Sequence, residues 1–191
     1  MMTVYLFWHR PFADIGQEAY EAALTAFHRE LVKRTCEGLQ GSATYRISET
    51  RWLDGLPGYE DWNFVESSAA LDPLNKMAVA PDMWDVHAGI SSKTDVGHGG
   101  IYYHVLGDAD PKALTRTAWL KRPRGIRYEA PLKEIADQVT GSVSVWRKQM
   151  VLGPGYEFAL LSDSSLTLDL PDGWEAHYVD RTLLHSGMAD L

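Results

Sequence analysis

The chain has 191 residues, of which 45% are hydrophobic and 23% are charged, and its formal net charge at pH 7 is −8. A chain of this size buries roughly 70% of its unfolded surface, so its core needs no disulfide or metal ion to be stable. The acidic balance excludes sequence-independent binding of DNA or RNA, which requires many Lys and Arg residues to displace counterions.

Cysteine usage and the start of the chain bear on location. Cys36 is the single cysteine, so an internal disulfide and a multi-cysteine metal site are both excluded. A reducing compartment fits this usage best, and we expect a cytoplasmic protein. The first apolar run has no basic region before it and is far shorter than the ~20 residues of a membrane span. We therefore predict no targeting segment and no contact with a membrane.

The first quarter of the chain predicts a central strand followed by a helix. Residues 4–8 form a continuous apolar run, which is typical of a short strand that is covered on both faces. Apolar residues then recur at spacings of four, three and four positions. They predict a helix over residues 18–34, with an apolar stripe made of Tyr20, Leu24, Phe27 and Leu31.

A hairpin and an interrupted helix complete the first half. Apolar and polar residues alternate over residues 43–48, which predicts a strand with one polar face. Pro57-Gly58 suits the centre of a type II turn, so we expect residues 59–66 to return as the next strand. Ser67-Ser68 can cap the helix that follows, and Pro81 interrupts that helix.

The second half repeats this order after a glycine-rich linker. We expect residues 91–100 to form the linker and residues 101–106 to form the next strand. A short helix is predicted from Asp110-Pro111 to about Trp119, and another over residues 131–139. The remaining predicted elements are a strand over 143–146, a short helix or turn near Ser164, and a last strand over 175–184.

One short stretch occurs twice. Residues 57–60 read Pro-Gly-Tyr-Glu and return as residues 154–157, at an offset of 97 residues that also relates Tyr5 to Tyr102. A period near half of the chain indicates a duplicated architecture. We interpret the two glutamates, Glu60 and Glu157, as sheet-edge residues of a hairpin and leave them out of the candidate site.

Each half thus reads roughly as strand, helix, strand, strand and helix, with a closing strand in the second half. This order resembles the ferredoxin-like α+β unit, and two such units in one chain resemble a fused member of the dimeric α+β barrel superfamily. The resemblance implies an α+β fold in which paired sheets enclose a space and helices lie outside, with halves at residues 1–98 and 99–191. It leaves open whether the strand over 101–106 closes the first sheet or opens the second.

The resemblance also implies a small-molecule pocket between sheets and helices. Enzymes of this superfamily include cofactor-free monooxygenases, and isomerases or decarboxylases of cyclic compounds. We therefore expect a small cyclic or carboxylate ligand and no nucleic acid. The alternative is a non-catalytic ligand-binding or dimerisation module, in which the aromatic residues fill a core and the sheets form a homodimer. The sequence does not decide between an enzyme and such a module.

Polar residues on covered strands are the candidates for the pocket. His9 ends the first strand beside a loop, where an imidazole can act as a general base near neutral pH, and it is the candidate catalytic residue. A structural or surface histidine is the competing interpretation, because the sequence supplies no orienting partner. The candidate ligand-binding residues on the strands are Arg46, Asn63, His104 and Tyr178.

Basic residues gather between positions 116 and 127 of an otherwise acidic chain. Among them, Lys121 and Arg122 are candidates to bind a carboxylate or phosphate group. Trp119, beside them, could form an aromatic wall for a ligand. The alternative is a solvated loop, since Lys and Arg are exposed by default.

We expect no cofactor and no protein-bound metal. The histidines are scattered, and no His-Glu-x-x-His motif or Asp-rich loop occurs. His28 and His87 lie on or beside helical apolar stripes, where we interpret them as hydrogen-bonded residues at the edge of the core. Fused barrels that are similar to chlorite dismutase bind haem through one histidine, which His87 could supply chemically. The chain is shorter than those enzymes and has no recognisable haem-ligand segment, so haem is the least favoured interpretation.

Overall fold

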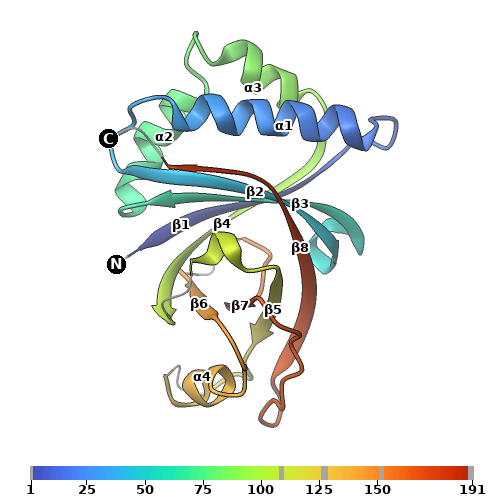
Figure 1. Ribbon diagram of the computed structural model, residues 1–191, viewed down its shortest axis with the longest axis vertical. Helices are drawn as coiled ribbons and strands as arrows, with labels where there is room; N and C mark the ends of the chain where they lie inside the picture. The colour runs from blue at the N-terminus through green and yellow to red at the C-terminus, as the bar shows by residue number, and fades with distance from the viewer. Residues whose placement is uncertain (1, 108–109, 126–128, 151–152, 189–191) are drawn as a thin grey trace.

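The computed structural model describes residues 2–107, 110–125, 129–150 and 153–188. Eight strands form a closed barrel in the order β1-β3-β2-β8-β5-β7-β6-β4. Figure 1 shows α1, α2 and α3 together on one side of it and α4 at the opposite end. The strands are β1 (Thr3–Pro11), β2 (Leu39–Thr50), β3 (Leu56–Val65), β4 (Thr94–Leu106), β5 (Arg116–Lys121), β6 (Val143–Lys148), β7 (Phe158–Ser162) and β8 (Glu175–Met188). The helices are α1 (Gln17–Val32), α2 (Leu71–Ala78), α3 (Trp84–Ser91) and α4 (Glu129–Ala136), with 3-10 turns η1 (Arg51–Leu53), η2 (Ser68–Ala70) and η3 (Pro111–Ala113).

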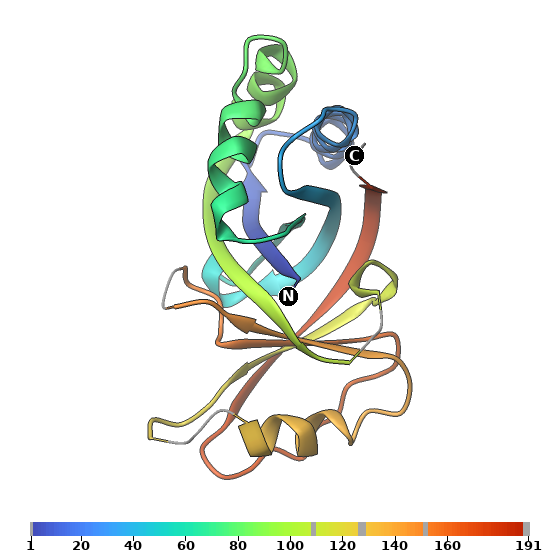
Figure 2. The same cartoon turned by 90° about the vertical axis from the view of Figure 1, so that its left-hand side faces the viewer.

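Two long strands, β4 and β8, connect the two ends of the barrel, and Figure 2 shows both running along its length. β4 pairs with β1 through residues 94–103 and with β6 through residues 102–106. β8 pairs with β5 through residues 175–180 and with β2 through residues 181–188. The segment 101–106 therefore belongs to both ends of the barrel, and β4 runs through the expected boundary between residues 98 and 99.

The register of β1 and β3 sends alternate side chains to opposite faces. Trp8 pairs with Glu60 and Leu6 pairs with Trp62, and all four lie buried in the barrel. The neighbouring positions face α1, α2 and α3 instead. They are Tyr5, Phe7, His9, Asp61 and Asn63.

Aromatic side chains fill the interior of the barrel. Trp8, Trp62, Trp119 and Trp146 are fully buried there. The ring centroids of Trp8 and Trp119 lie 5.3 Å apart, as do those of Trp62 and Trp146, and both pairs meet edge to face. Aromatic pairs favour this geometry. The centre of the barrel, around these four rings, is therefore a packed core.

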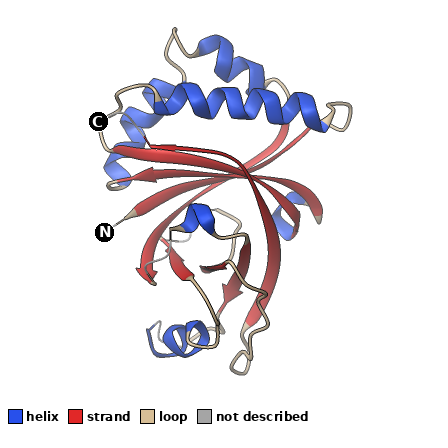
Figure 3. Ribbon diagram, viewed as in Figure 1, coloured by secondary structure: helices blue, strands red, loops and turns tan. Residues whose placement is uncertain are grey.

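Most predicted strands and helices are confirmed, with shifted ends (Figure 3). Ser67 caps η2, where its side chain accepts a hydrogen bond from the backbone N–H of Ala69. Pro81 lies between α2 and α3, as expected for a residue that interrupts a helix. Among the described residues, no helix is both long enough and apolar enough to cross a membrane.

The predicted turn at Pro57-Gly58 is wrong, because both residues belong to β3. The chain reverses three residues earlier, at Asp54 and Gly55, which have φ values of 59° and 70°. Gly58 is required for another reason. A Cβ there would lie 2.7 Å from the carbonyl oxygen of His9, so glycine lets β1 and β3 approach at this point. The second copy of the motif lies in a bend between β6 and β7.

Two other segments also differ from prediction. The expected linker over 91–100 is mostly β4, whose Gly97 and Gly99 face aromatic rings on β1. The helix expected from 110 to 119 is limited to η3, because residues 116–121 form β5 and pair with β7 and β8 on both sides. The offset of 97 residues relates Tyr5 to Tyr102, yet their strands β1 and β4 are neighbours in the barrel.

Candidate functional site

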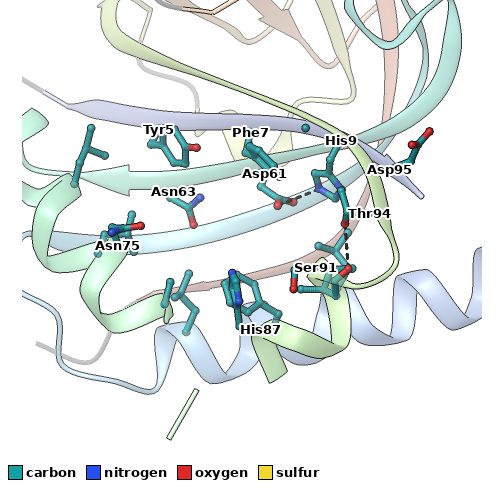
Figure 4. A pocket seen from close by; sticks show the side chains of 18 residues that line it. Tyr5, Phe7, His9, Asp61, Asn63, Asn75, His87, Ser91, Thr94 and Asp95 are labelled. Carbon is teal, nitrogen blue, oxygen red and sulfur yellow. Dashed lines mark hydrogen bonds and ion pairs between the residues drawn. The ribbon is translucent and has the colours of Figure 1, made fainter. Parts of the chain in front are cut away.

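A pocket of about 610 Å³ lies between the outer face of β1 and β3 and the three helices α1, α2 and α3. Its size is within the range of roughly 300–1,000 Å³ that is usual for small-molecule sites. Figure 4 shows the sheet residues along one side and His87, from α3, on the opposite side. The apolar part of the helical wall comes from Leu24, Phe27, Leu31, Leu71, Leu74, Ala78 and Ile90.

A row of three rings from β1 forms the sheet side of the pocket. The rings of Phe7 and His9 are stacked with centroids 5.2 Å apart, and those of Tyr5 and Phe7 are stacked at 6.5 Å. Two glycines of β4 leave space for this row. A Cβ at Gly97 would lie 2.5 Å from the Phe7 ring, and one at Gly99 would lie 2.8 Å from the Tyr5 hydroxyl. The glycine-rich sequence thus allows flat rings to line the pocket.

Asp61 lies between two histidines at the wall of this pocket. Its Oδ2 accepts a hydrogen bond from His9 Nε2 at 3.1 Å, and its Oδ1 is 3.1 Å from His28 Nε2. The second contact has the distance of an ion pair but not the alignment of a hydrogen bond. Burial by itself would raise the pKa of the Asp61 carboxyl, but attraction to His28 and His9 outweighs it and holds the pKa below its ordinary value. Asp61 is therefore ionised.

Each histidine is held by a hydroxyl on its other ring nitrogen. His9 Nδ1 is 2.6 Å from the Tyr20 hydroxyl, which is 2.8 Å from Thr94 Oγ1. His28 Nδ1 is 2.5 Å from Ser42 Oγ, which donates to Asn63 Oδ1 at 2.9 Å. Burial raises the pKa of Tyr20 above its ordinary value, so its hydroxyl stays protonated. Each histidine is thus linked to the pocket by a short chain of hydrogen bonds, a hydroxyl arm that ends at Thr94 for His9 and at Asn63 for His28. Thr94 and Asn63 both line the pocket.

The structure brings together only two of the predicted site residues, because His9 and Asn63 line this pocket. Arg46 forms an ion pair with Glu21 at 3.1 Å and does not line it. His104 borders a separate hollow of about 420 Å³, where its ring contacts Trp146 at a centroid distance of 5.3 Å.

The other predicted residues lie away from the pocket. Trp119 is fully buried inside the barrel, so it forms no wall for a ligand in this pocket. Lys121 and Arg122 form ion pairs with Glu175 and Glu157 at 2.7 and 2.8 Å. Tyr178 is 45% exposed. Lys121 and Arg122 therefore lie in a different region from His9, because β5 ends at the far side of the barrel from α1, as Figure 1 shows.

Sequence reasoning missed Asp61, Tyr20 and Thr94, and it interpreted His28 only as a core-edge residue. His28 is confirmed as buried and hydrogen-bonded. A signal for Asp61 was present, since this acid stands two residues before Asn63 in a strand that is rich in aromatic residues. Side chains two apart share a face. Among the described residues, no group of three or more His, Cys, Asp or Glu side chains is arranged to hold a metal ion.

Comparison with known proteins identifies solved structures that have a similar fold. No protein-family model and no curated protein matches the chain. An anthrone oxidase-like protein of known structure has a TM-score of 0.56 and 12% sequence identity, and the alignment covers 98% of this chain and 93% of that chain. A candidate monooxygenase from Lactobacillus acidophilus NCFM has a TM-score of 0.54 and 9% identity, with 100% of both chains covered. The chain shares the fold of both proteins.

This likeness supports an α+β barrel, consistent with the superfamily that the order of elements resembles. At identities of 12% and 9%, it concerns the fold alone. The assignment of a function therefore has to rest on the pocket and its polar residues.

Proposed function

We propose that the chain is an enzyme that binds a planar aromatic compound in the pocket beneath α1, α2 and α3 and removes a proton from it without a cofactor. The observation that carries this proposal is the His9–Asp61 pair, which lies at the wall of an apolar pocket lined by stacked rings. A buried acid that orients an imidazole is a recurrent arrangement for general-base catalysis.

The shape and lining of the pocket favour a flat ligand. Tyr5, Phe7 and His9 present ring faces or edges over a continuous stretch, and aliphatic side chains of the helices face them. Offset or edge-to-face contacts with such rings stabilise an aromatic ligand by about 0.5–1.5 kcal/mol beyond the burial of its surface. The polar groups on the sheet side are Asp61, Asn63, Thr94 and Asp95. The helices add Asn75, His87 and Ser91, so a flat ligand with a small number of polar groups fits best.

His9 is the better proton acceptor of the pair. The lowered pKa of Asp61 makes its carboxylate a weak base. A carboxylate in this position orients the imidazole and stabilises the imidazolium that forms when the ring takes up a proton. General-base catalysis of this kind contributes typically about 10²–10⁴-fold to a rate. Asp61 therefore acts as the orienting partner that the sequence does not reveal.

Oxidation by O₂ is the reaction class that we favour over isomerisation and decarboxylation. The support is the naming of the two proteins that share the fold, an anthrone oxidase-like protein and a candidate monooxygenase. Anthrone is a tricyclic ketone whose methylene group loses a proton to give an aromatic oxyanion. Reaction of that anion with O₂, with the abstracted proton returned from the imidazolium, yields the quinone and one water, so deprotonation by the protein is the step that needs a base.

The test uses anthrone as the probe and Asp61→Asn as the variant. Wild-type protein should bind anthrone and form quinone with matching O₂ uptake, and Asp61→Asn should lower the rate by about 10²-fold or more. The control is Asp82→Asn, which removes an acid that pairs with Arg34 at 3.0 Å outside the pocket. Unchanged turnover in Asp61→Asn would overturn the assignment. Binding without turnover by wild-type protein would favour a non-catalytic binding module.

The architecture supports a further proposal. We propose that the barrel consists of two fused ferredoxin-like halves, β1 to β4 and β5 to β8. The boundary predicted between residues 98 and 99 falls inside β4, so the strand order favours a boundary between Leu106 and Arg116 instead. The support is the strand order in the closed barrel. The run β4-β1-β3-β2 is followed by the run β8-β5-β7-β6, in which each strand is the counterpart of the strand four places away in the chain. The homodimer and the cytoplasmic location stay predictions.

A further inference from the structure

The ring of His9 lines the pocket, but its two nitrogens are not available to a ligand. It is 1% exposed, and both ring nitrogens already have partners, with Nε2 on Asp61 and Nδ1 on the Tyr20 hydroxyl. A ligand therefore cannot hydrogen-bond to either nitrogen while these contacts persist. If His9 is the base, a proton has to reach it through another group.

We propose that Thr94 and Tyr20 form a proton path from the pocket to His9, in which Thr94 Oγ1 is the atom that meets the acidic hydrogen of the ligand. This inference rests on the function proposed above. It assigns Thr94 as a catalytic residue and Tyr20 as a positioning residue that passes the proton on.

The path is continuous in the structure. Thr94 stands at the start of β4 and lines the pocket, beside Ser91 and His9 in Figure 4. Its Oγ1 is 2.8 Å from the Tyr20 hydroxyl, and that hydroxyl is 2.6 Å from His9 Nδ1. Tyr20 is fully buried on α1, so water does not interrupt the contact. Both distances are those of good hydrogen bonds.

The number of hydrogens shows that the path can accept a proton. It contains four contacts: Thr94 to the carbonyl of Ile90, Thr94 to Tyr20, Tyr20 to His9, and His9 to Asp61. With one N–H on the His9 ring, the three side chains Thr94, Tyr20 and His9 supply three hydrogens for these four contacts. One contact then lacks a hydrogen. A second N–H on His9 fills all four, so uptake of a single proton completes the network.

The transfer needs no redox partner. The X–H bond of the ligand breaks and its electron pair stays on the ligand, while the proton passes to Thr94 Oγ1. In the same concerted step, the hydroxyl hydrogen of Thr94 moves to Tyr20, and that of Tyr20 moves to His9 Nδ1. The product is a ligand anion beside an imidazolium that Asp61 holds in place.

The neighbouring charges leave this path undisturbed. Asp95 follows Thr94 in β4 and also lines the pocket, but it is held by Arg10, whose Nη2 lies 3.2 Å from its Oδ2. The same Arg10 nitrogen is 3.1 Å from Asp54. His28 contacts the other oxygen of Asp61 at 3.1 Å and so helps to fix the carboxylate. The raised pKa of Tyr20 keeps its hydroxyl neutral, as a relay requires.

The first test needs no ligand. ¹⁵N-edited NMR of the unliganded protein measures how fast the ring hydrogens of His9 exchange with solvent. Thr94→Val and Tyr20→Phe should each slow this exchange at least tenfold, and Thr94→Ser should restore it. The matched controls are Thr117→Val, which removes a buried hydroxyl from β5, and Tyr45→Phe, which removes one from the barrel interior. Wild-type exchange in both pocket variants would overturn the path.

The second test uses anthrone turnover. Thr94→Val should lower kcat by about 10²-fold with little change in KM, whereas a purely structural role would shift the melting temperature and both constants together. Thr94→Ser should recover most of kcat. Full turnover in Thr94→Val would overturn the inference. If wild-type protein does not act on anthrone, the proposed function fails for that probe, and the exchange rates still decide the path.

Discussion

Arg181 and Glu60 form an ion pair inside the barrel, where Arg181 Nε lies 3.2 Å from Glu60 Oε1 and both side chains are 0% exposed. The pair is within ion-pair distance, although the Nε–H is not aligned for a hydrogen bond. Glu60 also accepts hydrogen bonds from the indole N–H groups of Trp8 at 2.8 Å and Trp62 at 2.5 Å. The guanidinium lies 3.7 Å from the ring centroid of Tyr45. Both charges are thus compensated within the packed core.

Glu60→Gln should destabilise the fold strongly. The change leaves the guanidinium of Arg181 buried without its carboxylate, and breaking a buried pair in this way costs about 3–5 kcal/mol. Urea denaturation followed by tryptophan fluorescence measures the loss.

The double variant Glu60→Gln with Arg181→Met is the control for this prediction. It removes both charges, so it should recover part of the lost free energy of unfolding. A Glu60→Gln protein that unfolds at the wild-type urea concentration would contradict the interpretation of the pair.

The environment of Glu60 could not be predicted from the sequence. The repeated Pro-Gly-Tyr-Glu stretch suggested a sheet-edge residue, but Glu60 points into a closed barrel and its charge is buried. The apolar run at residues 4–8 and the stripe that starts at Tyr20 correctly predict β1 and α1, because both patterns depend on local spacing. Closure of the barrel depends on pairings such as β2 with β8, which are far apart in sequence. No local pattern encodes them.

The candidate site divides in the same way. His9 and Asn63 could be selected because each is a polar residue on a covered strand. Asp61 can be recognised as a site residue only from the tertiary structure, in which α1 places His28 and Tyr20 over the sheet. Thr94 can be recognised only when residues 94–106 are known to form β4. Arg46 and Arg122 have ion-pair partners, Glu21 and Glu157, that only the tertiary structure reveals.

Asp61 should make the stability of the fold sensitive to acid. Its pKa is lower in the folded chain than its ordinary value of 3.8. Its contribution is therefore fully present above that pH. As the pH falls further, the unfolded chain binds the proton first, and stability is lost by up to about 1.4 kcal/mol for each pH unit. Urea denaturation between about pH 5 and pH 3 measures this slope.

Asp61→Asn is the comparison that isolates this carboxyl. The variant should be less stable than wild-type protein at pH 5, because two histidines lose their acidic partner. The difference should shrink as the pH falls below about 4, where the wild-type advantage disappears. A difference that stays constant over this range would show that Asp61 does not have a lowered pKa.

Cys36 should react slowly with thiol reagents. Partial burial raises the pKa of its thiol, and the nearby charge of Glu37 raises it further. Because the thiolate is the reactive form, labelling by iodoacetamide near pH 8 should be several-fold slower than labelling of glutathione. Glu37→Gln should speed the reaction modestly, and urea-unfolded protein should react at the rate of a free thiol. Equal rates for folded and unfolded protein would contradict the prediction.

Gly97→Ala should damage both the fold and the pocket. Its Cβ would lie 2.5 Å from the Phe7 ring, so the ring has to move away from β4 and into the ligand space. Overpacking of this kind costs about 1–3 kcal/mol, and thermal unfolding followed by circular dichroism measures it. Binding of anthrone should weaken in the same variant.

Gly89→Ala is the matched control, since Gly89 lies in α3 and nothing is within 4 Å of a Cβ at that position. There the change should stabilise the protein by about 0.5–1 kcal/mol, because alanine favours the helix over the unfolded chain. The two glycine variants should therefore shift the melting temperature in opposite directions. Equal shifts would mean that the Phe7 ring adjusts without cost, and the role of Gly97 in shaping the pocket would have to be abandoned.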